Sequence, residues 1–190
     1  MTQVYIIHGY GASPSDHWFP WLKEELSAMG AKVTILHMPN SSNPKAREWQ
    51  RHLNRKIKAA DENIFFVAHS LGCISLLNYL NSLNPENIEF GGMVLVSGFV
   101  SKLDNLPELD GFINEEIDFE AIVNATDNRV VIGAQDDPNV PHEHTKEMSK
   151  ILEAELVSLK AGGHLLGSNG YTQFPLVLNK IKGLITQQYK

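Results

Sequence analysis

The stretch NIFFVAHSLGCISLL, residues 63–77, decides the fold that we expect for this chain. Its apolar run at 64–67 is continuous, which is typical of a strand covered by helices on both faces. Ser70 follows this run, and a helix-like segment begins at the next residue. Ala68 and Gly72 stand two positions to either side of the serine, where a larger side chain would collide with the backbone of a sharp turn. The pattern is typical of the turn that exposes a nucleophilic serine, with alanine replacing the first glycine of Gly-x-Ser-x-Gly. The alternative is that Ser70 only caps the helix that follows it.

The remainder of the chain alternates in the same way between short apolar runs and helix-length segments. We predict strands over 4–8, 32–38, 63–69, 92–97, 129–133 and 155–159, and helices over 16–29, 44–60, 71–83, 140–154 and 174–188. This order predicts a single α/β domain over residues 1–190, built on a doubly wound, mostly parallel sheet of about six strands. Functional residues should then lie at the carboxyl ends of the strands.

The connection at 99–127 is long for a loop between two strands, and it carries apolar residues among acidic ones. We expect this insert to fold over other parts of the protein. It would form either a small cap beside the active site or a surface helix.

The charge and composition of the chain argue against nucleic acids and membranes as its binding partners. The net charge of −6 offers no attraction to nucleic acid or to anionic lipid. No apolar stretch approaches the roughly 18 residues of a membrane span. Cys73 is the single cysteine, so no intramolecular disulfide can form, and no signal peptide is evident. We therefore expect a cytoplasmic monomer or small homo-oligomer that binds neither nucleic acid nor membranes.

A serine nucleophile needs a histidine as general base, and the chain holds eight histidines. In this fold the catalytic residues follow the order serine, acid, histidine, which leaves His142, His144 and His164. His164 lies in a glycine-rich loop just after the last predicted strand, and we take it as the base. His142 and His144 form a His-x-His pair at a helix start, but no third ligand has zinc-like spacing. We therefore predict no metal and no organic cofactor.

The acid should come from the segment that follows the strand at 129–133, where Asp136 and Asp137 are adjacent. Its role is to hold the imidazole in one tautomer and to stabilise its protonated form. Consecutive loop residues point in different directions, and no spacing rule chooses between the two. The alternative is that they cap the helix near Pro141.

An oxyanion hole requires two backbone N–H donors. Leu71, directly after the serine, supplies one of them, and the loop after the first strand supplies the other. We assign Tyr10 as this second donor, with Gly9 as the alternative. The Gly-Tyr-Gly turn lacks both the Gly-x-Gly-x-x-Gly pattern and the Lys-Ser/Thr of a P-loop, so we do not expect nucleotide binding there.

Six ordered motif blocks, spread over almost the whole chain, resemble the YdeN/retinoblastoma-binding protein 9 family of small serine hydrolases, and in particular its bacterial YdeN-type members. The blocks are His8-Gly9-Tyr10 with His17-Trp18, Met38-Pro39-Asn40, the stretch Ala68 to Cys73, the stretch Leu95 to Phe99, Asp136-Asp137 with Val140-Pro141, and Gly162-Gly163-His164.

The resemblance implies a compact α/β-hydrolase with a reduced cap. It also implies that Asp137, at the first position of Asp-x-x-Val-Pro, is the triad acid. Relatives of the human type carry a different glycine turn at positions 8–10, so the resemblance says least about Tyr10.

Together these observations predict a serine hydrolase that cleaves a small carboxylic ester, or an aminoacyl ester or amide, through an acyl-enzyme. Ser70 would be the nucleophile, His164 the base and Asp137 the residue that orients it. Peptidase action on short peptides would differ only in the pocket. The alternative from another class is a catalytically weak hydrolase-fold protein that acts as a protein-binding module.

Overall fold

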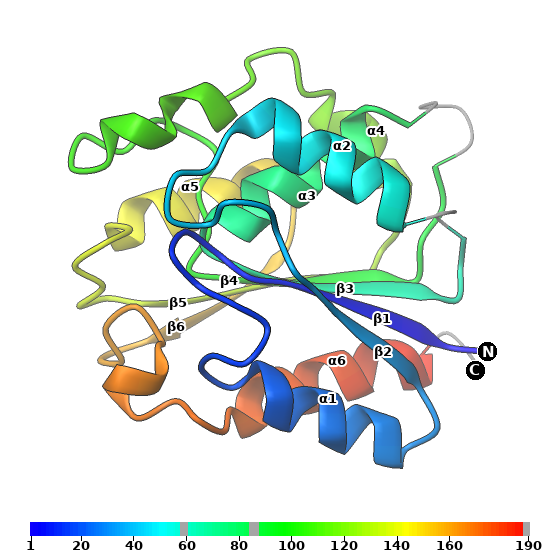
Figure 1. Cartoon of the computed structure of the whole chain (residues 1–190). Coiled ribbons are helices and arrows are strands. Elements are labelled where there is room, and N and C mark those ends of the chain that lie inside the picture. Colours follow the sequence, from blue (N-terminus) through cyan, green and yellow to red (C-terminus); the bar gives the residue numbers. More distant parts are fainter. Residues whose placement is uncertain (58–60, 84–87, 188–190) are drawn as a thin grey trace.

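The computed structural model describes residues 1–57, 61–83 and 88–187, which form a six-stranded sheet between two layers of helices (Figure 1). The strands are β1 (Gln3–Ile7), β2 (Lys32–Leu36), β3 (Ile64–His69), β4 (Gly92–Val96), β5 (Arg129–Ala134) and β6 (Glu155–Leu159). Their order across the sheet is β2-β1-β3-β4-β5-β6, and every neighbouring pair is parallel. The chain reverses its direction of travel across the sheet between β1 and β3. The loops after these two strands therefore leave a crevice between them.

Helices cover the two faces of the sheet unequally. Figure 1 shows α1 (Phe19–Ala28) and α6 (Pro175–Gln187) on one face. The other face carries α2 (Ala46–Lys56), α3 (Leu71–Asn81), α4 (Phe119–Asn124) and α5 (His142–Ile151). Every crossover between parallel strands thus has a helix to pack on the sheet, as this topology requires.

Alternate residues of the central strands enter two separate cores. On β3, Phe66 and Ala68 pack into the core under α2 and α3, whereas Phe65 and Val67 pack into the core under α1 and α6. All four are fully buried. A strand that is covered on both faces has no solvent-facing side, which is why its sequence is apolar without interruption.

The fold class predicted from the sequence is correct, and the sheet is parallel throughout the residues that the structure describes. The element bounds differ by a few residues. The first helix begins at Phe19 rather than at residue 16, with a proline in its first turn, so Asp16 and His17 remain in the preceding loop. The predicted ends of two helices, at 58–60 and at 188, lie outside the described residues.

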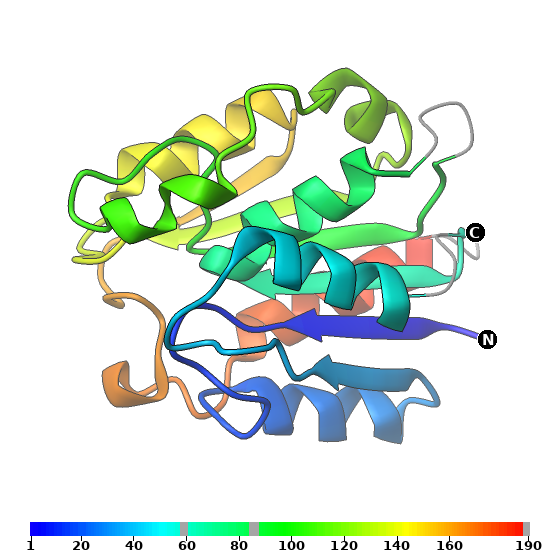
Figure 2. The same ribbon diagram turned by 45° about the horizontal axis from the view of Figure 1, so that its top comes forward.

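The insert lies on the same side of the sheet as α3 and α5 (Figure 2, green). It contains a short 3-10 helix, η2 (Pro107–Phe112), followed by α4. Phe112 and Ile122 are buried in the core under α2 and α3, which fixes the insert to the main body of the protein. The side-chain amide of Asn105 donates to the carbonyl of Asn139 at 2.9 Å and so ties the insert to the loop after β5.

Within the described part of the chain, no helix is both long and apolar enough to cross a lipid bilayer.

Candidate active site

Ser70 occupies the turn between β3 and α3, with the strained backbone angles φ 54° and ψ −122°. Its side chain makes no capping hydrogen bond to α3, so a helix cap does not account for it. A Cβ atom on Gly72 would lie 2.5 Å from the carbonyl oxygen of Ile7. Only glycine fits there, because α3 begins directly against the end of β1.

Backbone strain gathers at the same edge of the sheet. Five of the six non-glycine residues described with positive φ lie in loops that follow a strand: His17, Asn40, Ser70, Ser97 and Leu165. Such angles cost about 1–3 kcal/mol each and concentrate at functional sites. The carboxyl edge of the sheet, where functional residues were expected, is therefore where the fold tolerates strain.

His164 brings two side chains from distant parts of the chain into one line. Its Nε2 lies 2.9 Å from Ser70 Oγ, and its Nδ1 lies 2.7 Å from Asp137 Oδ2. All three side chains are buried. Because the carboxylate can only accept, Nδ1 carries the proton, and the lone pair of Nε2 faces the serine hydroxyl. This arrangement lets the hydroxyl donate its proton to the imidazole.

The two adjacent aspartates have different partners. Asp137 binds His164 through Oδ2, while its Oδ1 accepts the N–H groups of Asn139 and Val140 at 2.9 and 3.0 Å. Asp136 does not pair with the imidazole. Its Oδ1 accepts two backbone N–H groups in the loop that carries His164, at 2.8 and 2.9 Å. Neither aspartate caps α5, whose N-cap residue Pro141 has no side-chain capping bond.

His8 fixes the turn that was expected to hold the second oxyanion donor. Its Nε2 accepts the N–H of Met38 at 3.1 Å, so the proton is on Nδ1, which donates to the carbonyl of Gly9 at 3.0 Å. Burial lowers the pKa of His8, which keeps the ring neutral. In a trans peptide the carbonyl and the following N–H point in opposite directions, so the Tyr10 N–H is directed away from His8. A Cβ on Gly9 would lie only 2.9 Å from that of Ser70, which places this turn against the serine.

His69 and His17 surround the site without entering the line of hydrogen bonds. His69 Nε2 donates to the carbonyl of His164 at 2.9 Å, and His17 Nδ1 accepts the N–H of Gly167 at 3.0 Å. Burial lowers the pKa of His17 and lowers that of His69 well below the usual value. Both rings are therefore neutral at pH 7.

His142 and His144 lie on α5. Their ring nitrogens contact the hydroxyls of Ser158 and Ser101 at 3.0 and 2.9 Å, respectively. The structure therefore gives the two members of the His-x-His pair separate partners.

Ser70 and His164 line a cavity of about 490 Å³. Leu106 and Leu109 of the insert form an apolar part of its wall, and the insert thus reaches the site as a small cap. Asp16 is the only acidic side chain among the lining residues. The cavity thus brings Ser70 and His164 together with Gly9 and Tyr10 of the loop after β1.

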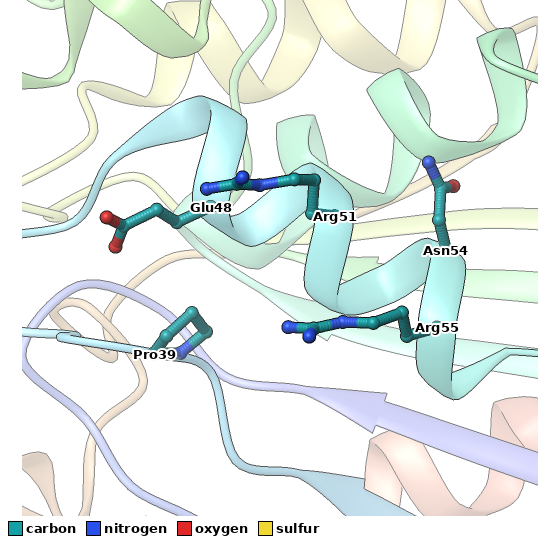
Figure 3. Close-up of a pocket in the computed structure, with 5 residues that line it drawn as sticks. All are labelled: Pro39, Glu48, Arg51, Asn54 and Arg55. Atoms are coloured by element: carbon teal, nitrogen blue, oxygen red, sulfur yellow. The ribbon is translucent and has the colours of Figure 1, made fainter.

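A second cavity, of about 560 Å³, lies between α2 and Pro39 (Figure 3). Arg51 and Arg55 extend from α2 along this gap, together with Glu48 (Figure 3). Its lining holds no serine, cysteine or histidine and therefore no nucleophile with an adjacent base.

Comparison with known proteins assigns the chain to a family. The serine hydrolase family matches residues 4–182. This chain belongs to the serine hydrolase family. The serine hydrolase is 39% identical over 186 residues to the YdeN protein of Bacillus subtilis, covering 98% of this chain and 97% of YdeN. The resemblance to YdeN-type members is therefore confirmed.

Solved structures agree with the fold of this serine hydrolase. The crystal structure of the B. subtilis ydeN gene product matches with a TM-score of 0.94 and 38% identity, over 98% of this chain and all (100%) of that chain. Est1E from Butyrivibrio proteoclasticus matches with a TM-score of 0.72 and 16% identity, covering 99% of this chain and 88% of its own. At that identity the likeness to Est1E concerns the fold alone.

The structure of the serine hydrolase also shows site residues for which the sequence predicts no role. His8 binds the carbonyl of Gly9 in the turn beside Ser70, and the indole N–H of Trp18 donates to the carbonyl of Leu165 at 3.1 Å, one residue after His164. Both lie in a motif block that resembles the family, but a motif does not reveal hydrogen bonds to backbone groups elsewhere in the chain. Only the packed structure supplies these partners.

Proposed function

We propose that this serine hydrolase cleaves small carboxylic esters, or aminoacyl esters or amides, by acyl transfer from substrate to Ser70 and then to water. The observation that carries the proposal is the hydrogen-bonded line from Asp137 through His164 to Ser70. The line ends in a cavity that the turn with Gly9 and Tyr10 also lines. This is the nucleophile, base and orienting acid of a serine triad, in the chain order of the α/β-hydrolases.

Each residue of the line has a distinct part in the proposed reaction. Ser70 Oγ bonds to the substrate carbonyl carbon while its proton passes to His164 Nε2. Asp137 stabilises the imidazolium that results. His164 then gives the proton to the leaving alcohol or amine, and the carbon–heteroatom bond breaks. A water molecule, deprotonated by His164, next attacks the acyl-serine. The bond between the acyl carbon and Ser70 Oγ breaks, His164 returns the proton to Oγ, and the acid is released. No step requires a metal or an organic cofactor.

Two backbone N–H groups would stabilise the negative oxygen of the tetrahedral intermediate. Leu71 is the first residue of α3, so its N–H lies at the positive end of that helix. Tyr10 offers the second N–H because His8 holds the preceding carbonyl on the opposite side of the peptide. Donors fixed before the reaction starts need no reorganisation when charge develops, which makes such a site effective.

The lining of the cavity supports the two substrate classes. Leu106 and Leu109 suit an apolar acyl or alkoxy group. Asp16 would attract the ammonium group of an aminoacyl substrate and repel a carboxylate. The cavity volume of about 490 Å³ suits a small substrate rather than a polymer.

Labelling with a fluorophosphonate tests the mechanism, because this probe captures an activated serine as a stable phosphonyl adduct. We expect one adduct, mapped by mass spectrometry to Ser70, that is absent from Ser70→Ala. A panel of small esters, aminoacyl esters, aminoacyl amides and dipeptides should compete with labelling in proportion to their turnover. A folded protein with no adduct and no turnover would favour the alternative, a hydrolase-fold protein that acts through protein contacts.

A further inference from the structure

The loop that carries His164 follows β6, which is an edge strand with a neighbour on one side only. It contains two consecutive glycines, Gly162 and Gly163, and the second has φ +57°. Glycine has the widest conformational freedom of any residue, so this segment would not hold a fixed position by itself. A general base must nevertheless lie within hydrogen-bond reach of its serine. Other parts of the protein must therefore anchor the loop.

Three side chains bind the backbone of residues 162–165, the part of this loop around His164. Trp18 binds the carbonyl of Leu165, and His69 binds the carbonyl of His164 itself. Asp136 binds the segment before the histidine, where one carboxylate oxygen accepts the N–H groups of Gly162 and Gly163 at 2.8 and 2.9 Å. Trp18 and His69 are buried inside the fold, whereas Asp136 is exposed. Asp136 can therefore be replaced without opening a cavity in either core.

The contact of Asp136 has the form of an anion-binding turn, in which successive backbone N–H groups converge on one oxygen. The N–H groups belong to the two residues directly before His164. The carboxylate thus sets the point from which the histidine side chain extends.

We propose that Asp136 is a positioning residue for the general base, an inference that rests on the proposed function of His164. The two adjacent aspartates have complementary roles, because Asp137 orients the imidazole ring and Asp136 fixes the backbone that carries it. Both follow β5, and Gln135 N–H, just before them, donates to Leu159 O at 2.9 Å. The end of β5 and the two aspartates after it therefore fix the end of β6, the loop and the ring of His164 in position relative to Ser70.

Two substitutions at Asp136 test the proposal against one control. Asp136→Ala removes the acceptor, and kcat on an activated ester should fall about 10- to 100-fold, since a misplacement of about 1 Å can cost 100-fold. KM should change by less than about twofold, because Asp136 does not line the cavity. Asp136→Asn keeps a carbonyl oxygen and should retain most of the activity. Asp127→Ala removes the same charge before the opposite end of β5, from an exposed position, and should behave as wild type.

A double-mutant cycle separates positioning of His164 from a general structural effect. In a His164→Ala background, Asp136→Ala should not lower the residual rate further, because the group it positions is gone. Amide hydrogen exchange at Gly162 and Gly163 should be slow in the wild type and faster in Asp136→Ala. If Asp136→Ala does not fold, the wild-type exchange rates and the Asp136→Asn kinetics carry the test.

Three results would overturn the inference: wild-type kcat in folded Asp136→Ala, an equal further loss in the His164→Ala background, or fast wild-type exchange at both glycines. An Asp136→Asn variant as impaired as Asp136→Ala would also overturn it, since the loss would then follow charge and not the acceptor. Failure of the proposed function is a separate outcome, in which Ser70→Ala and His164→Ala keep full turnover.

Discussion

Asp137 Oδ2 lies 2.7 Å from His164 Nδ1, and both groups are almost completely shielded from water. The same carboxylate accepts two backbone N–H groups through its other oxygen, so its position is set before it meets the histidine. One side chain therefore closes the loop after β5 and orients a ring carried by the loop after β6. This contact determines which nitrogen of His164 faces Ser70.

Replacing Asp137 by asparagine should abolish most of the activity while the fold remains. The amide can donate to Nδ1 and would move the proton to Nε2, which then cannot accept from Ser70. In another serine enzyme this defect lowered kcat by about 10⁴, and we expect a similar loss. Steady-state kinetics on a protein with wild-type circular dichroism checks it. Full activity in both Asp137→Asn and Asp136→Asn would show that His164 has no aspartate partner in this loop.

Replacing Ser70 by alanine should lower kcat by several decades, since the loss of a triad serine cost about 10⁶ in a well-studied protease. The hydroxyl makes no capping bond, and its removal costs only the contact with His164, so the free energy of unfolding should fall by about 1 kcal/mol. Turnover of an activated ester and the thermal midpoint of unfolding provide the two readouts. Near-wild-type turnover by folded Ser70→Ala would end the nucleophile assignment.

Replacing His8 by phenylalanine should affect catalysis and stability together. The Gly9 carbonyl would keep only the longer bond, of 3.4 Å, from the Ala12 N–H. The Tyr10 N–H would then be held less firmly, and kcat should fall by up to about 10²–10³, the effect of losing one oxyanion donor. The buried N–H of Met38 would lose its acceptor, which costs about 1–3 kcal/mol of unfolding free energy.

Kinetics and urea unfolding measure these two effects of His8→Phe. His52→Phe is the matched control, because His52 lies on α2 and does not line the cavity at Ser70. A His8→Phe protein with unchanged kcat would remove the support for Tyr10 as a donor.

Replacing Asp16 by asparagine should change substrate preference rather than general activity. An ammonium about 4 Å from a carboxylate gains about 1 kcal/mol even in water, which corresponds to roughly fivefold in kcat/KM. We expect at least this loss for an aminoacyl ester and little change for the neutral ester of the same shape. Asp110→Asn, whose carboxylate pairs with Lys102 outside the cavity, serves as control. Equal effects on both esters would mean that Asp16 does not contact the ammonium group.

The buried histidines should make the protein less stable as the pH falls below 7. Burial lowers the pKa of His69 and of His8 in the folded state, so the unfolded chain binds protons that the folded protein does not. Stability from each is complete above the unfolded pKa of about 6.5 and is lost as the pH falls from there toward the folded pKa, by up to about 1.4 kcal/mol per pH unit.

Urea unfolding at several values between pH 7 and 5 measures this slope. His69→Gln should reduce it, whatever its effect at pH 7. An identical slope in wild type and His69→Gln would contradict a neutral His69 in the folded protein.

Local patterns were sufficient for the fold. The continuous apolar run at 64–67 indicates a strand that is buried on both faces, and the small residues around Ser70 indicate a tight turn into a helix. These patterns can be recognised in the sequence because each one depends only on residues that are a few positions apart. Element bounds were less certain: the first helix begins at Phe19, later than its periodicity suggested, because a proline stands in its first turn.

Residue type and spacing alone did not choose between neighbouring site residues. The family resemblance favoured Asp137, and the packed chain supplies the physical reason. Asp136 and Asp137 have the same chemistry and adjoining positions. The pairing of β5 with β6 sets where the two following loops meet, and there the carboxylate of Asp137 reaches the ring of His164. His8, which precedes Ser70 in the sequence and cannot be its base by chain order, binds the carbonyl of Gly9 in the turn beside Ser70. These roles depend on hydrogen bonds between segments that are 27 or 30 residues apart, for Asp137 with His164 and for His8 with Met38. Side-chain type and local spacing carry no information about such contacts, because the twist and register of the sheet bring the segments together.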